Sequence, residues 1–125
     1  MSQLLYGYMT LILLLIILTT ICVLFSHGYA QEGPQIFIKP GSSSPFNPHF
    51  YVPQTITISK GVIITWRNSD SVDHSVTFIN PDLNAQLDIV RPNSTFTHKF
   101  DEVGTFDYYC RFYPFMTGQI IVTDK

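Results

Sequence analysis

A thiol and a thioether lie six residues apart near the end of the sequence. Cys110 ends an aromatic-rich apolar run, Met116 follows it, and a new apolar run begins after Gly118. Thiolates and thioethers are soft ligands, and they suit copper when one tight loop brings both together. The spacing therefore indicates a metal-binding loop between two strands.

Cys110 is the lone cysteine of the charged part of the chain, which begins at Glu32. The other cysteine, Cys22, lies in an apolar leader, so a disulfide within the domain is excluded. The leader directs the domain to a compartment in which free thiols oxidise. A lone thiol there is either buried as a small apolar side chain or bound to a metal. Met116 on the same loop favours the metal ligand.

The leader contains no charged side chain, whereas the rest of the chain contains 7 Lys and Arg and 9 Asp and Glu. Tyr8–Phe25 is just long enough to span a bilayer. Gly28 and Ala30 also place small residues before Gln31, as a signal peptidase requires. Because no Lys or Arg precedes the apolar stretch, a cleaved signal peptide and a retained membrane anchor both stay open for residues 1–30. Either one places the domain outside the cytoplasm, secreted or anchored to the outer face of the cell membrane.

Beyond the leader, residues 31–34 form a short linker and residues 35–125 form one domain. Eight short runs with β character lie between Gly, Pro, Asn and Asp turn signals. The runs are 35–39, 55–58, 62–66, 74–79, 86–90, 94–100, 105–109 and 119–123. Several alternate with a period of two, and no helical period extends over ten residues. The pattern predicts an all-β fold, an antiparallel sandwich or barrel.

Charge and composition narrow the function classes. The formal net charge is −2, and no basic run occurs, which argues against nucleic-acid binding. No Ser/His/Asp set and no pair of carboxylates stands out, so we expect no enzyme. A binding or carrier protein is the class that these residues favour.

The order of motifs in residues 35–124 resembles that of a cupredoxin, or blue copper protein, of the plastocyanin and amicyanin kind. The matching residues are Pro53, Ile56, Ile58 and Gly61, then Trp66-Arg67-Asn68-Ser69-Asp70 and His74, then Gly104-Thr105-Phe106-Asp107-Tyr108-Tyr109-Cys110, and finally Pro114, Phe115, Met116 and Gly118. This resemblance implies an eight-stranded Greek-key β-sandwich with one mononuclear copper site at one end.

The resemblance implies that His74, Cys110 and Met116 are metal ligands. Such a site usually has two histidines and one cysteine in a plane with a long axial methionine. The second histidine would be the residue three after the cysteine, and here that residue is Tyr113. Three interpretations stay open: copper held by three ligands, copper held also by the Tyr113 phenolate, or a lost site.

The two other histidines of the domain differ in whether they could replace the missing ligand. We expect His98 to pair opposite Phe106 in a hairpin, roughly 13 Å below Cys110, as a core histidine. His49 lies in a Pro-rich loop whose place the sequence does not define. In the family, the residue after the first histidine ties its strand to the cysteine loop, and Ser75 has a hydroxyl that could do so as a second-shell residue.

The resemblance implies single-electron transfer through a transient complex with a redox partner protein. The partner would dock on an apolar patch formed by Phe112, Pro114 and Phe115. Two alternatives remain. One is a Cu(I) carrier or scavenger without electron transfer, which the missing imidazole favours, and the other is a metal-free β-sandwich that acts as an interaction module.

Overall fold

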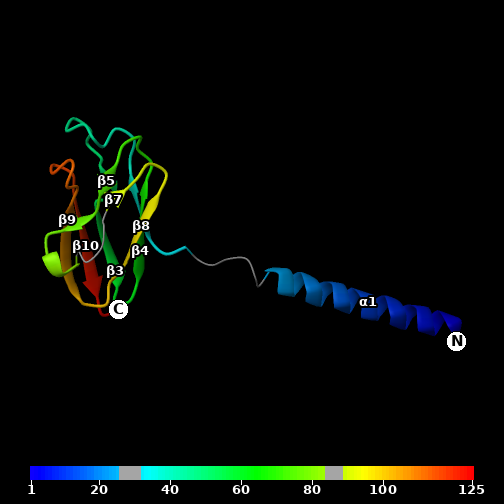
Figure 1. Cartoon of the computed structure of the whole chain (residues 1–125). Helices are drawn as coiled ribbons and strands as arrows, with labels where there is room; N and C mark the ends of the chain where they lie inside the picture. Colours follow the sequence, from blue (N-terminus) through cyan, green and yellow to red (C-terminus); the bar gives the residue numbers. More distant parts are fainter. Residues whose placement is uncertain (26–31, 84–88) are drawn as a thin grey trace. The chain divides into compact units, whose positions relative to one another are not determined.

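The computed structural model describes residues 1–25, 32–83 and 89–125. The chain divides into two compact units, Met1–Gln31 and Glu32–Lys125. Helix α1 (Ser2–Phe25) belongs to the first unit, and the strands belong to the second (Figure 1). The proposed cleavage residues Gly28 and Ala30 lie outside the described residues.

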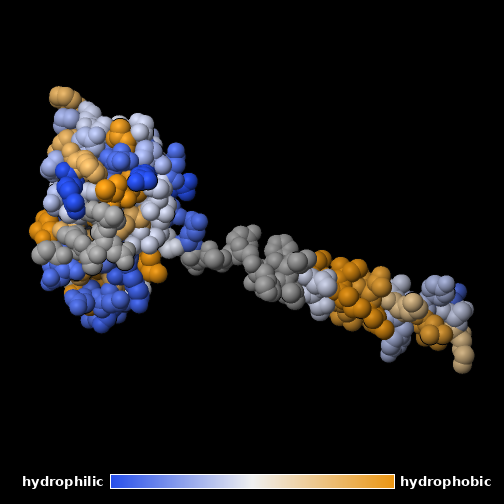
Figure 2. Space-filling view, in the orientation of Figure 1, coloured by the Kyte–Doolittle hydropathy of each residue, from blue (hydrophilic) through white to orange (hydrophobic). Residues whose placement is uncertain are grey.

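Helix α1 has the composition of a membrane-spanning helix. Its segment Ser2–Ile21 is long and apolar enough to cross a bilayer, and none of that segment is buried against protein. Figure 2 shows apolar side chains over most of its length. The hydroxyls of Thr10, Thr19 and Thr20 donate to carbonyls three or four residues earlier in the helix. These three threonine hydroxyls are therefore satisfied within the helix, as a lipid environment requires.

The second unit is a β-sandwich, as the sequence predicts, with two four-stranded sheets and one two-stranded sheet among the described residues. The first sheet has the order β2 (Tyr51–Val52), β1 (Gln35–Ile38), β4 (Ile63–Asn68), β8 (Thr95–Lys99). The second has the order β3 (Thr55–Ser59), β10 (Thr117–Thr123), β9 (Gly104–Tyr109), β6 (Thr77–Phe78). The small sheet pairs β5 (His74–Ser75) with β7 (Ile89–Val90), and η1 (Pro81–Leu83) is a 3₁₀ turn.

The strand pattern differs from the prediction in two ways. The expected strand 74–79 divides at Val76 into β5, which pairs with β7, and β6, which pairs with β9. The short strand β2 has no clear sequence pattern. The described residues therefore form ten strand segments rather than eight. In addition, β1 runs parallel to β4 and β10 runs parallel to β3, whereas we expected antiparallel pairs throughout.

The core lies between the two large sheets and follows the period-two alternation. In β4, Ile64 and Trp66 are fully buried while Ile63 and Arg67 face solvent. Trp66 packs edge-on against the rings of Phe78 and Tyr108, which belong to the opposite sheet. These contacts hold β4 and β9 in register across the sandwich, and both strands lead toward the loops that carry the candidate ligands.

Gly118 allows a close approach inside the second sheet. It pairs with Tyr108 of β9, and a Cβ at position 118 would lie 2.2 Å from the tyrosine ring. Only glycine leaves room for that ring at the beginning of β10. Tyr108 precedes Cys110 by two residues, so this contact also fixes the end of β9 at the candidate metal site.

The expected hairpin around His98 is wrong. Strand β8 pairs with β4, so His98 lies opposite Ile64 rather than Phe106, and β8 and β9 belong to different sheets. The chain crosses the sandwich between these strands instead of turning back beside itself. His98 nevertheless packs on the core, with ring centroids 5.0 Å from Phe78 and 4.8 Å from Phe100.

Candidate metal centre

Two backbone hydrogen bonds close the loop that carries both sulfur atoms. The Cys110 N–H donates to the Met116 carbonyl (3.0 Å), and the Met116 N–H donates to the Tyr113 carbonyl (2.9 Å). Both sulfur-bearing side chains are fully buried. The loop lies at the same end of the sandwich as the loop 39–50, the end away from the C-terminus (Figure 1). The sequence therefore produces a closed turn that brings a thiol and a thioether inward.

His74 lies beside Cys110 although 36 residues separate them. The two-residue strand β5 pairs His74 with Val90 and turns the fully buried imidazole toward the Cys110 loop. Its Nδ1 atom is 3.7 Å from Cys110 Sγ. A zinc-sized ion held by one sulfur and one nitrogen at ordinary bond lengths keeps the two ligand atoms about 3.5–3.8 Å apart. The spacing therefore fits two ligands of one metal ion.

Ser75 joins the strand of His74 to the loop of Cys110. Its backbone N–H donates to Cys110 Sγ (3.4 Å), and its hydroxyl accepts from the Arg111 N–H (2.7 Å). The Tyr51 hydroxyl donates to the Ser75 carbonyl (2.6 Å), and Thr77 shares a hydrogen bond with the Ser75 hydroxyl (2.9 Å). These four bonds to one buried residue fix the relative positions of the imidazole and the thiol.

Asp70 is the partner of His74 on the other side of the ring. Its Oδ2 atom lies 2.8 Å from His74 Nε2, and its side chain is 5% exposed. The other carboxylate oxygen, Oδ1, accepts from the backbone N–H groups of Gly41 (3.0 Å) and Ser71 (2.9 Å). From the sequence, Asp70 is expected to help form the turn before His74, and the contact with the imidazole was not predicted. The signal that could have revealed it is its spacing, four residues before a candidate histidine ligand.

The surroundings of Cys110 favour its thiolate form. Burial raises the pKa of the thiol, but hydrogen bonds from His74 and from the backbone N–H groups of Ser75, Tyr113 and Phe112 outweigh burial and lower the pKa. The thiolate is the form that binds a metal ion. The site therefore prepares the thiol for metal binding before any metal is present.

Asp70 and His74 also shift each other's pKa. Burial lowers the pKa of His74, but hydrogen bonds to Cys110 and Asp70 outweigh it and raise the pKa. Burial raises the pKa of Asp70, but hydrogen bonds from Gly41, His74 and Ser71 outweigh it and lower the pKa. The Asp70 side chain is therefore an ionised carboxylate near neutral pH, and it can only accept a hydrogen bond.

Tyr113 packs on the imidazole. Its half-buried ring lies 5.3 Å from the His74 ring and 6.2 Å from the ring of Phe115, measured between ring centroids. Tyr113 therefore lies next to the candidate ligands, at the position that the resemblance assigns to the missing histidine.

The other described histidines lie elsewhere. His49 is exposed, and its backbone N–H donates to Asn47 Oδ1. His98 packs against Phe78 and Phe100, while His27 lies outside the described residues. Within residues 1–25, 32–83 and 89–125, no group of three or more His, Cys, Asp and Glu side chains is arranged to hold a metal ion. The candidate set is one imidazole and one thiol supplemented by a thioether.

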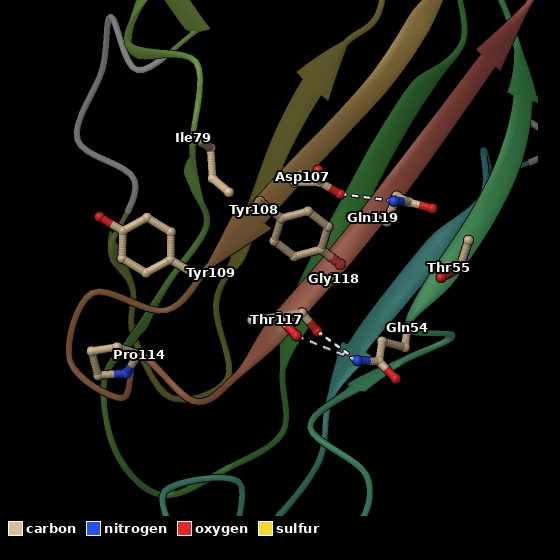
Figure 3. Close-up of a pocket in the computed structure, with 10 residues that line it drawn as sticks. All are labelled: Gln54, Thr55, Ile79, Asp107, Tyr108, Tyr109, Pro114, Thr117, Gly118 and Gln119. Atoms are coloured by element: carbon tan, nitrogen blue, oxygen red, sulfur yellow. Dashed lines mark hydrogen bonds between the residues drawn. The ribbon is translucent and has the colours of Figure 1, made fainter.

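A groove lies on the second sheet, and its lining does not include the candidate ligands His74, Cys110 and Met116. It has a volume of about 530 Å³, and Figure 3 shows Asp107 bonded to Gln119 and Gln54 bonded to Thr117 along it. The described residues that line it include Tyr109 and Pro114, which flank the Cys110 loop, but neither His74 nor Cys110. The groove is a feature of the outer sheet face rather than the metal site.

A β-sandwich with candidate histidine, cysteine and methionine ligands buried at one end is typical of a class of copper proteins. The family model described as a cupredoxin-like domain matches residues 12–122, so this chain belongs to the cupredoxin family. Copper is the cofactor of that family.

Individual relatives agree with this assignment. Amicyanin-alpha of Methylorubrum extorquens is 34% identical over 76 residues, which cover 58% of this chain and 63% of the relative. Plastocyanin of Tetradesmus obliquus is 30% identical over 83 residues and is covered to 57%. The chain thus spans about three fifths of the length of these curated relatives.

A solved structure extends the similarity to the whole of another protein. A purple cupredoxin from Nitrosopumilus maritimus is 31% identical and has a TM-score of 0.65. The alignment covers 72% of this chain and 99% of that one. The fold of the second unit is therefore a cupredoxin sandwich throughout its described part.

Proposed function

We propose that this chain binds one copper ion through His74, Cys110 and Met116 and carries single electrons outside the cytoplasm. The observation that carries the proposal is the 3.7 Å spacing of His74 Nδ1 and Cys110 Sγ inside a fully buried, hydrogen-bonded frame. Copper, when bound, would supply the Cu(I)/Cu(II) couple. Membership of a family whose amicyanin and plastocyanin members are electron carriers rather than enzymes supports the same function.

The hydrogen bonds around the candidate ligands suit a metal site whose charge changes while the ligands stay in place. Ser75 and Asp70 fix the imidazole and the thiol from opposite sides, and two backbone hydrogen bonds fix the loop between Cys110 and Met116. Ligands that are held before the metal arrives need little rearrangement when it gains or loses an electron. Burial of the three side chains also keeps water away from the sulfur atoms.

Tyr113 gives the proposed site its unusual feature. We infer that the Tyr113 ring shields the His74 imidazole from solvent. The ligands are then His74, Cys110 and Met116, without Tyr113. The packing of Tyr113 on His74, with ring centroids 5.3 Å apart, supports the shielding role. Coordination by the Tyr113 phenolate is the competing arrangement, and it would favour Cu(II), the harder ion.

The second candidate function is a Cu(I) carrier or scavenger. The observation that favours it is again Tyr113, because a set of one imidazole, one thiolate and one thioether is softer than the usual set with two imidazoles. Such a site would bind Cu(I) tightly, and the copper would not cycle between Cu(I) and Cu(II). A metal-free interaction module is the remaining outcome.

The docking surface for a redox partner would be the apolar patch around the Cys110 loop. Phe112 is 46% exposed and Phe115 is 38% exposed, and Pro114 between them is also exposed. Phe115 packs on Phe50 of the loop 39–50, with ring centroids 5.3 Å apart. A small apolar surface of this kind suits a short-lived complex.

The test is a copper titration of the purified protein followed by voltammetry. The proposal predicts one copper per chain and a reversible one-electron wave. Tight binding of Cu(I) alone, without a reversible wave, would move the function to a carrier or scavenger. Binding no tighter than that of the Cys110→Ala variant would show that the metal site is lost and that the domain serves as an interaction module.

A further inference from the structure

We propose that Asp70 is a positioning residue that fixes the orientation and the tautomer of the His74 imidazole for metal binding. The inference rests on the proposed copper function. It concerns a residue that lies behind the ligand rather than on the metal. The observation that carries it is the 2.8 Å contact between Asp70 Oδ2 and His74 Nε2, the ring nitrogen remote from Cys110.

The Asp70 carboxylate is itself held in place. Its Oδ1 atom accepts hydrogen bonds from two backbone N–H groups, those of Gly41 and Ser71, so its oxygens cannot exchange places freely. Gly41 belongs to the loop 39–50, which therefore braces the carboxylate from outside the turn that leads to His74. Oδ1 therefore holds the carboxylate to the backbone, and Oδ2 contacts the imidazole.

This arrangement decides which nitrogen of His74 carries the proton. An ionised carboxylate only accepts, so it requires a proton on Nε2. In the neutral ring, Nδ1 then has a free lone pair, and Nδ1 is the atom 3.7 Å from Cys110 Sγ. Asp70 thus selects the tautomer in which the metal-facing nitrogen is a ligand. A carboxylate behind a histidine ligand also makes the imidazole a stronger donor.

The turn before His74 does not depend on the Asp70 side chain alone. Asn68 accepts from the Asp70 N–H (2.8 Å), and its amide donates to the carbonyls of Val72 and Val90 (2.8 Å each). Asn68 therefore connects the turn to β7, the partner strand of β5. A substitution that preserves the shape of Asp70 can change the hydrogen bond to His74 while the turn persists.

Asp70→Asn is such a substitution, and its effect follows from the hydrogen bonds. The asparagine oxygen must stay with the N–H groups of Gly41 and Ser71, because an amide NH₂ cannot accept from them. The NH₂ group then faces His74 Nε2 and donates to it, which places the ring proton on Nδ1. The metal-facing nitrogen loses its lone pair, and copper binding must first reverse the tautomer.

The experiment compares Cu(I) affinity, Cu(II) affinity and reduction potential in the wild-type protein, Asp70→Asn and Asp73→Asn. Loss of a carboxylate behind a histidine ligand typically weakens metal affinity by about 10–100-fold. We expect Cu(II) to lose more than Cu(I), and each extra tenfold loss raises the potential by about 59 mV for one electron. Asp73 is exposed in the same turn, so Asp73→Asn removes the same charge without touching the imidazole and should change little.

The proton position on His74 can also be measured directly in the wild-type protein. In the diamagnetic Cu(I) form, nuclear magnetic resonance should show a slowly exchanging proton on His74 Nε2, because the proton is buried against Asp70. A rapidly exchanging or absent Nε2 proton overturns the inference, and so does an Asp70→Asn protein with wild-type affinities and potential. Failure of the wild-type protein to bind copper would instead overturn the proposed function, and the inference with it.

Discussion

Tyr113 is the residue of the candidate site that differs from the family pattern described above. It packs on His74, at the position where the amicyanin and plastocyanin pattern has a second histidine ligand. The rest of the frame around the candidate metal site does not depend on it, because Ser75 and Asp70 hold the other ligands. Its side chain can therefore be exchanged without disturbing the buried set.

Tyr113→His should convert the site toward the usual set of two histidines and one cysteine. We expect Cu(II) affinity to rise by about tenfold or more, equivalent to about 1.4 kcal/mol, because an imidazole adds a metal bond. Titration with Cu(II) measures the change, and Tyr113→Phe is the matched control that retains a ring without a donor. Equal Cu(II) affinity in the histidine variant and in the wild type would contradict the family placement of position 113.

At the scale of residues, the sequence was sufficient to propose the sulfur ligands but not the residue behind the histidine. Cys110 and Met116 share one short loop, so local spacing reveals them. His74 could be assigned only through the family motif, since it precedes Cys110 by 36 positions in the sequence. The role of Asp70 depends on its contact with His74 and on support from Gly41 of the loop 39–50. The four-residue spacing before His74 is a local signal for the first contact, and no local pattern predicts the second.

At the scale of elements, period-two alternation predicted the sandwich and most strands, while pairing depended on distant parts of the chain. The parallel pairs β1–β4 and β3–β10 and the separation of β8 from β9 follow from how the chain crosses between sheets. Alternation shows which face of a strand is buried, and it does not show which strand lies beside it. The wrong hairpin at His98 is the direct result.

His98 makes the stability of the sandwich depend on pH. Burial lowers its pKa, and the nearby Asp101 only partly opposes this. The unfolded chain therefore binds a proton more readily than the folded one, so His98 lowers the free energy of unfolding as pH falls below its unfolded pKa of about 6.5. His74 has the opposite shift in the metal-free protein, so the effect must be isolated with a variant.

The variant is His98→Phe, compared with the wild type by urea unfolding of the metal-free protein at about pH 5 and about pH 8. The free-energy difference between the two proteins should move in favour of His98→Phe at the lower pH, because only the wild type must bury a proton between Phe78 and Phe100. The exposed His49 supplies a control, His49→Gln, which should follow the wild type. Parallel pH curves for wild type and His98→Phe would contradict this account.

At the scale of the whole molecule, the chain combines an apolar helix with a domain that carries all of its charged residues. Such a helix suits either a signal peptide or a membrane anchor, and both lead out of the cytoplasm. The free Cys110 adds a requirement, because an oxidising compartment would threaten a thiol that was exposed. Burial protects the Cys110 thiol, and the proposed metal binding would protect it further.

Export can be tested with a reporter enzyme that is active only where its disulfides form, fused after Lys125 and produced in a bacterial host. We expect activity from the full chain and none when residues 1–31 are removed, since α1 provides the targeting signal. A reporter that works only in the cytoplasm should give the reverse result. Activity that is independent of α1 would contradict export through this helix, and the mass of the mature protein shows whether it ends before Gln31.

The most direct test of the copper site is the visible and electron paramagnetic resonance spectrum of the Cu(II)-loaded protein. A bond between Cu(II) and the Cys110 thiolate gives intense visible absorption, and we predict that band at one copper per chain. The Cys110→Ala protein should lose the band while its metal-free fold persists. Copper bound without the band, or a spectrum unchanged by Cys110→Ala, would contradict the assignment of Cys110 as the central ligand.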